Sequence, residues 1–306
     1  MSRRINRSSR WLQTALILLL LLLCAVVLLP ADGVREESGT AASVRQFDER
    51  ARQQSSVDYE EFQAAPVRPA VKIVPAPAIS RAGTGVALIM DDVGYDLDAL
   101  QRVLALPFHV AISILPDAPH AAEAANMAHE AGSTVMLHLP MEPSNPKYRA
   151  RMNGFFLTAE MDEAQTRNHF IQALSRVPYA AGVNNHMGSL LTTQAEPMRW
   201  VMEVCKSRQL FFVDSKTAHN SVAANIAAKA GVAWASRRIF LDHTVDDEDL
   251  RLAWKSAMKC AKRKGSCIVI AHPHAETLHF LEQQVSEDER AFIRPLTSLL
   301  HSGDMS

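Results

Sequence analysis

From residue 85 onward, short apolar runs alternate with amphipathic helical stretches, and this alternation constrains the fold more than any other feature. Such alternation predicts parallel strands joined by crossover helices. About seven strand-helix units fit into the chain, more than a small open sheet needs. We therefore expect an α/β fold, a distorted (β/α)7-type barrel. The expected strands are residues 85–90, 110–115, 134–139, 180–186, 210–214, 232–236 and 267–272.

The first 30 residues have the pattern of a membrane-targeting segment. Four arginines precede a run that is entirely apolar over residues 15–29. Basic residues before an apolar core orient the N-terminus toward the cytoplasm and direct the following chain across the membrane. We expect residues 1–30 to be a signal anchor, with a cleaved signal peptide as the alternative. The remaining chain is then expected in the bacterial periplasm, anchored to the inner membrane.

A linker and a single domain are expected to follow this segment. Residues 31–83 hold Ala, Pro and charged side chains with little periodic hydrophobicity, and the prolines between residues 66 and 77 oppose helix formation. Residues 84–306 are long enough to bury a sizeable core. A net charge of -1 gives no argument for a nucleic-acid partner. In an exported domain, Cys260 and Cys267 either pair or remain free thiols.

Polar residues of one chemical kind follow the apolar runs. Asp91 and Asp92 follow the first run, His138 lies in the third, His186 ends the fourth and His272 ends the last. The carboxyl ends of strands in a parallel barrel share one face, where active sites lie. Adjacent carboxylates repel unless a cation lies near, and zinc accepts Asp and His ligands. We expect these side chains to gather around a divalent metal, zinc by preference; the alternative for the aspartates is a helix cap.

Five short segments occur in order between residues 85 and 283: IMDDVGYD, MLHLPMEP, GVNNHMGS, FFVDSKT and IAHPHAETL. Together they resemble the divergent polysaccharide deacetylase family, an outlying branch of the carbohydrate esterase/polysaccharide deacetylase superfamily. The resemblance implies a distorted barrel, a divalent metal and hydrolysis of acetyl groups from sugars. Two superfamily features are not evident, an arginine-proline motif and a tryptophan after the strand that ends at Asp214.

The resemblance implies two catalytic residues. Asp91 matches the general base and His272 the general acid, with His274 as its substitute. The implied function is a metal-dependent deacetylase, a hydrolase acting on an acetylated envelope polysaccharide or peptidoglycan. The alternative is a catalytically degenerate domain that binds peptidoglycan or an envelope protein partner, which the two missing features favour.

The resemblance also implies three metal ligands. Asp92 matches the first ligand, and His138 matches the first histidine of the superfamily's HxxxH motif. Glu142 stands in the place of the second histidine. Because prolines around Glu142 oppose the helical turn that brings positions four apart together, His186 is the preferred third ligand and Glu142 the alternative.

Five further polar residues have two interpretations each. Asn184 and Asn185 either bind a sugar hydroxyl or satisfy backbone groups at the end of a strand. Asp214 either orients a ligand histidine or caps the next segment. Asp242 lies either in the cleft or in a turn, and Tyr95 either lines the cleft or packs against its own turn.

Overall fold

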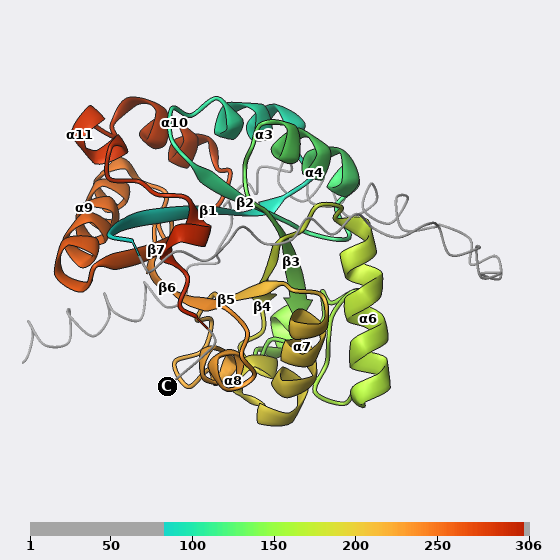
Figure 1. The fold of residues 1–306 in the computed structure, drawn as a ribbon. Coiled ribbons are helices and arrows are strands. Elements are labelled where there is room, and N and C mark those ends of the chain that lie inside the picture. The colour runs from blue at the N-terminus through green and yellow to red at the C-terminus, as the bar shows by residue number, and fades with distance from the viewer. Residues whose placement is uncertain (1–82, 303–306) are drawn as a thin grey trace, which may run out of the picture. The chain divides into compact units, whose positions relative to one another are not determined.

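The computed structural model of the chain describes residues 83–302. Within them, seven parallel strands pair in sequence order and β7 pairs back onto β1, which closes a barrel (Figure 1). This confirms the predicted seven-stranded α/β barrel. The strands are β1 (Gly85–Val93), β2 (Val110–Ile114), β3 (Val135–Met141), β4 (Gly182–Met187), β5 (Phe211–Asp214), β6 (Trp234–Phe240) and β7 (Ser266–Ala271).

Helices connect the strands and surround the barrel (Figure 1). Their ends follow local chemistry: α6 begins with a capping box between Asp162 and Gln165, and α9 ends at Gly265 with a φ of 82°. The α-helices are α3 (Leu97–Leu104), α4 (Ala121–Glu130), α5 (Pro146–Arg149), α6 (Glu163–Arg176), α7 (Ala195–Ser207), α8 (Ala223–Lys229), α9 (Asp247–Lys264), α10 (Ala275–Gln283) and α11 (Glu287–Arg290), with 3-10 turns η1 (Leu191–Thr193) and η2 (Leu296–Leu299).

The predicted targeting segment, residues 1–30, lies outside the described residues, as does the predicted linker except for its last residue. Among residues 83–302, none of the helices combines the length and apolar character that a membrane crossing requires. The anchor, the linker and the periplasmic location therefore stay predictions.

The strands separate two apolar cores because successive side chains point to opposite faces of a strand. In β1, Val86, Leu88 and Met90 belong to the outer core, which packs against the helices. Ala87 and Ile89 belong to the inner core, which fills the barrel. Residues two apart therefore share a face, and this rule decides which polar side chains enter the barrel.

A glycine makes room for the largest side chain of the inner core. A Cβ atom at Gly182 of β4 would lie 2.1 Å from the Phe211 ring of neighbouring β5. No side chain at position 182 would fit at that separation, so the Phe211 ring packs directly against the backbone of Gly182. The barrel interior is thus packed with side chains rather than open.

The end of the described chain closes the inner core. Leu296, Leu299 and Leu300 are at most 2% exposed and pack with the inward-facing residues of the strands. The next residue, His301, pairs with Trp234 at the start of β6 through two backbone hydrogen bonds of 3.0 and 2.7 Å. The amino-terminal end of the barrel is therefore sealed by the chain's own C-terminal segment.

One strand differs from its sequence prediction. The apolar run 232–236 predicts a strand there, but β6 spans Trp234–Phe240. The last four residues, RRIF, lack an apolar pattern because this wall of the barrel is only half-buried. The correction matters for the site, since Arg237 and Phe240 both line its cavity.

Candidate active site

Because side chains alternate along each strand, several polar side chains point into the barrel at the carboxyl ends of the strands. In β1 the inward series Ala87, Ile89 continues to Asp91, and in β7 the inward residue Ile270 is followed two positions later by His272. Both residues line one cavity of about 220 Å³. The cavity is lined by Asp91, Asp92, His138, Asn185, His186, Met187, Ser215, Thr217, Arg237, Phe240, Ile270 and His272.

Asp91 and Asp92 both face this cavity although neighbours on a regular strand point to opposite faces. The pairing between β1 and β2 shifts register between Met90 and Val93, which marks a bulge at the two aspartates. Asp92 also has a φ of 56°, a left-handed conformation that Asp tolerates better than most residues. The broken ladder and the turned backbone place two carboxylates from one strand in one site.

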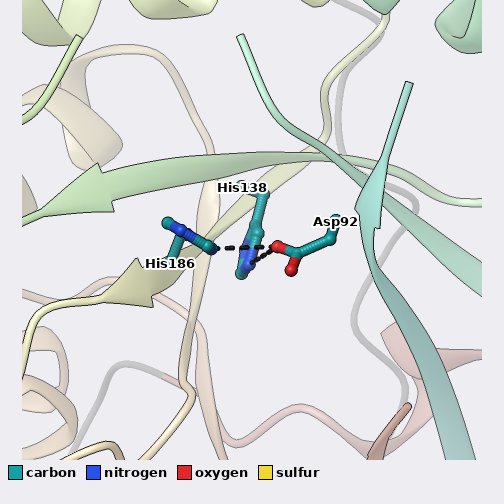
Figure 2. A group of neighbouring side chains, drawn as sticks. All are labelled: Asp92, His138 and His186. Carbon is teal, nitrogen blue, oxygen red and sulfur yellow. Dashed lines mark ion pairs between the residues drawn. The ribbon is translucent and has the colours of Figure 1, made fainter. Parts of the chain in front are cut away.

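Asp92, His138 and His186 form the centre of the site. Figure 2 shows the two imidazole rings converging on the same carboxylate oxygen of Asp92. The distances to Oδ1 are 3.1 Å from His138 Nε2 and 2.9 Å from His186 Nδ1. Each residue offers one ligand atom, and these atoms lie within 4.8 Å of one another.

The contacts around Asp92 fit a metal centre. Its Oδ1 atom is buried and has no hydrogen-bond partner, although two ring nitrogens lie near it. Buried carboxylate oxygens are ordinarily hydrogen-bonded, so this oxygen needs another explanation. Two imidazoles and one carboxylate that converge on one point are the kind of donor set that catalytic zinc sites use.

Asn184 of β4 orients both a ligand and a carboxylate. Its Nδ2 donates to Asp91 Oδ1 at 2.8 Å, which fixes the direction of the amide. Its Oδ1 accepts a hydrogen bond from Ser113 at 2.5 Å and faces His138 Nδ1 at 2.9 Å. Because the amide oxygen accepts only, the neutral, metal-binding form of His138 carries its hydrogen on Nδ1 and presents the lone pair of Nε2 to the site.

The electrostatics of the centre favour a bound cation. Burial opposes ionisation of Asp92, but His138 and His186 more than offset it and hold the pKa of the carboxyl well below its usual range. Burial also lowers the pKa of His138, yet Asp91 and Asp92 raise it to about 9. Without a metal, His138 therefore holds a proton between the carboxylates, in the position that a metal ion would take.

His272 lies across the cavity, with its Nε2 atom 3.9 Å from Asp92 Oδ2. Its Nδ1 atom is hydrogen-bonded to Asp242 at 3.0 Å, and its backbone N–H donates to the same carboxylate at 2.6 Å. Thr277 donates a third hydrogen bond to Asp242 at 2.9 Å. Burial lowers the pKa of His272, but Asp242 raises it above the usual value, so the protonated ring is favoured.

Asp242, His272 and His274 also lie close enough together to be considered as a metal site. The difference from the first group is that the Asp242 oxygens already accept three hydrogen bonds. A carboxylate satisfied in this way positions a histidine rather than a metal. The sequence left Asp242 open between the cleft and a turn; in the structure it lies in the turn after β6, where its buried carboxylate holds His272.

Arg237 is a residue of the cavity that the sequence did not single out. It donates hydrogen bonds to the backbone oxygens of Ser215 and Lys216, which fixes the loop after β5. Burial lowers the pKa of Arg237, and the carboxylates of Asp91 and Asp214 act in the opposite direction. Its guanidinium stays charged. The only sequence signal was the pair of arginines that follows the expected strand 232–236.

Glu142, the alternative ligand, lies outside the central group. One carboxylate oxygen pairs with Arg149 at 3.3 Å, and the other accepts the backbone N–H of Ala159 at 2.8 Å. Both oxygens therefore serve the loop that follows β3. His186, the preferred ligand, is the one that the structure brings to Asp92 and His138.

The remaining polar residues have structural partners near the cavity. Asn185 Oδ1 accepts the backbone N–H of Ser215, and Asp214 accepts the backbone N–H of Lys216. Tyr95 is 54% exposed and donates to Asp117 at 3.1 Å. Cys260 and Cys267 are free thiols in the structure.

Comparison with known proteins agrees with the motifs. Residues 88–299 match the family model described as divergent polysaccharide deacetylase. The chain is 38% identical over 199 residues to the uncharacterized protein YibQ of Escherichia coli K12, covering 65% of this chain and 61% of that protein. It therefore spans less than two thirds of that relative. An uncharacterized protein of Haemophilus influenzae is 34% identical over 205 residues, covering 67% of this chain and 72% of its own.

A solved structure shares the fold. The crystal structure of the uncharacterized protein ATU2773 from Agrobacterium tumefaciens C58 superposes with a TM-score of 0.66 at 19% identity. The superposition covers 72% of this chain and 90% of that one. Similarity at this level of identity supports the barrel architecture alone.

Proposed function

The chain belongs to the divergent polysaccharide deacetylase family, and from this premise we propose that its barrel is a metal-dependent deacetylase. The proposed substrate is an acetylated glycan of the cell envelope, peptidoglycan or another polysaccharide. The observation that carries the proposal is the buried Asp92 oxygen, which lacks a hydrogen bond and faces the ring nitrogens of His138 and His186.

Asp92, His138 and His186 are the proposed ligands of a divalent metal, zinc by preference because of the nitrogen and oxygen donors. When bound, such an ion would polarise the acetyl carbonyl and acidify water at the site. Asn184 prepares the site for it by keeping the His138 Nε2 lone pair directed inward.

Asp91 is the proposed general base. It is 2% exposed, and Asn184 holds its Oδ1 atom, so the carboxylate has a fixed direction beside the cavity. A fixed carboxylate can accept the proton of a water molecule that attacks the acetyl carbon. The charged guanidinium of Arg237 lines the same cavity and attracts the carboxylate of Asp91.

His272 is the proposed general acid on the opposite side of the cavity. Asp242 holds its Nδ1 atom and favours the protonated ring, which leaves the Nε2 proton available to the leaving amine or alcohol. Phe240 lies beside this ring, with centroids 5.2 Å apart, and also lines the cavity. An apolar face at this position can contact the face of a sugar ring.

The envelope location rests on the sequence of the first 30 residues, whose basic-then-apolar order supports export and anchoring in the inner membrane. A deacetylase placed there would meet glycans on the periplasmic side. The acetylated glycan and the membrane are thus the two proposed partners of the chain.

Acetate release from acetylated glycan fragments tests the proposal. The full chain, purified in an uncharged detergent, should release acetate with zinc and lose the activity after chelation. Asp91→Asn and His272→Ala should each reduce the rate by about a hundredfold or more while the fold is retained. Folded, zinc-loaded protein that releases no acetate from a broad panel of glycans would refute it. Peptidoglycan binding that survives both substitutions would then favour a binding domain.

A further inference from the structure

A second cavity, distinct from the candidate active site, lies between β6 and α9. Its volume is about 490 Å³, within the range of about 300–1,000 Å³ that is common for small-molecule sites. The charged residues that line it are all basic: Arg237, Arg238, Lys259, Arg263 and Lys264. Among residues 83–302, no carboxylate belongs to this lining.

The basic residues come from two elements that fold onto each other. Lys259 and Arg263 lie four residues apart on α9 and so share one face of the helix. Like charges at this spacing destabilise a helix slightly. The helix dipole favours basic residues in the last turn of α9, but it does not explain Arg238, which reaches the same cavity from β6.

Four of the five basic residues of this cavity lack an acidic partner in the described part of the chain, whereas Arg237 is attracted by Asp91 and Asp214. Within residues 83–302, Arg238, Lys259, Arg263 and Lys264 form no ion pair within 4.0 Å, in contrast to arginines such as Arg102, which pairs with Glu282. Burial and the charge of Arg238 together lower the pKa of nearby His301. The cavity therefore has a positive potential that an anion would neutralise.

We propose that the cavity between β6 and α9 binds a phosphoryl group carried by a saccharide. Several uncompensated cations around one concave space match a group with two negative charges, and arginine donates paired hydrogen bonds to phosphate. The volume exceeds what a bare phosphate needs, so a sugar unit attached to it also fits. A flat membrane surface matches a concave site less well.

The position of Arg237 relates this site to the reaction. Arg237 lines both the basic cavity and the cavity that contains Asp91 and His272. The two cavities therefore meet at this residue of β6, and a phosphorylated glycan held by α9 would lie across this strand from the proposed active site. The inference about the substrate rests on the proposed deacetylase function and narrows that substrate to an acetylated glycan that carries phosphate. Binding of a phosphorylated sugar to the basic cavity does not depend on catalysis.

Calorimetry with N-acetylglucosamine 6-phosphate, and with N-acetylglucosamine as the neutral control, tests the binding. The full chain in uncharged detergent should bind the phosphorylated sugar and not the neutral one. Lys259→Gln combined with Arg263→Gln should weaken binding by about tenfold or more. The matched control removes the same charge from the same helix at two exposed positions outside the cavity, Lys255→Gln with Lys262→Gln, and should bind as the unchanged chain does.

Further variants separate the possible outcomes. Lys259→Arg with Arg263→Lys keeps both charges and should preserve binding, which excludes misfolding as the cause of a loss. His138→Ala should keep binding while it removes the proposed metal, so failure of the catalytic proposal leaves this test intact. Equal losses in the cavity pair and the control pair would overturn the site, because only general charge would then matter.

The membrane is the competing source of phosphoryl groups. Flotation with phosphatidylcholine vesicles, with and without phosphatidylglycerol, measures binding to such a surface. The proposal expects the cavity pair and the control pair to float alike. A loss of phosphatidylglycerol-dependent flotation in the cavity pair alone, with no binding of the phosphorylated sugar by the unchanged chain, would overturn the proposal in favour of a membrane contact.

Discussion

Zinc affinity should depend steeply on pH because the metal must displace a proton from His138. The carboxylates of Asp91 and Asp92 outweigh burial and raise the pKa of this imidazole to about 9, and only the neutral ring binds zinc. Below that pKa, the apparent association constant should rise about tenfold per pH unit. Between about pH 7 and 9 the gain is about a hundredfold, or about 3 kcal/mol.

A chelator-buffered zinc titration at pH 7, 8 and 9 measures this slope. His138→Ala should remove the pH dependence together with most of the affinity, whereas His129→Ala, an exposed histidine on α4, should leave both unchanged. Calorimetry in buffers of different ionisation enthalpy should show release of about one proton at pH 8. An affinity that is constant above pH 7.5 would refute the reasoning, since an ordinary imidazole is already neutral there.

The stability of the metal-free protein should fall as pH rises, whereas the zinc affinity should increase. A folded pKa above the unfolded value stabilises the fold while the group is protonated in both states, and this stabilisation is lost as pH rises through the folded pKa. With chelator present, the free energy of unfolding should therefore fall by up to about 3 kcal/mol between about pH 6.5 and 9. Urea unfolding monitored by circular dichroism measures it, and an increase over that interval would contradict the charge arrangement around His138.

Three further predictions test other parts of the molecule. Asp242→Asn should shift the alkaline limb of kcat/KM to lower pH, because the lost charge no longer favours protonated His272, with zinc content unchanged; an unshifted limb would exclude this positioning role. Arg237→Gln should lower acetate release about tenfold without loss of zinc, and equal activity would show that its charge does not assist the base. Leu299→Ala should cost about 2–5 kcal/mol of stability, measured by urea unfolding, whereas Leu252→Ala, 54% exposed, should change it by less than about 0.5 kcal/mol.

The sequence was most informative where periodicity and motif coincided. Apolar runs that end in Asp or His were enough to predict the parallel barrel and to bring His138 and His186 toward one face. The adjacent Asp91 and Asp92 were expected in one site, but the reason was invisible in the sequence. It is a bulge and a left-handed backbone, which depend on how β1 pairs with β2.

Tertiary contacts decided what the sequence left open. Asp242 follows a segment without a clear strand pattern, and its role appears only when β6 and β7 bring it beside His272. Arg237 was missed for a related reason, since a half-buried wall does not require the apolar pattern that marks a strand. Glu142 occupies the motif position of a histidine, but its loop directs it to Arg149.

The amide of Asn184 makes the two sides of the cavity chemically different. An amide has a donating end and an accepting end, and here the donating end meets Asp91 while the accepting end meets His138. One neutral group thus separates a side of the site suited to taking up protons from a side suited to holding a cation. Aspartate, nearly the same shape, would offer acceptors at both ends, and this single exchange would erase the distinction.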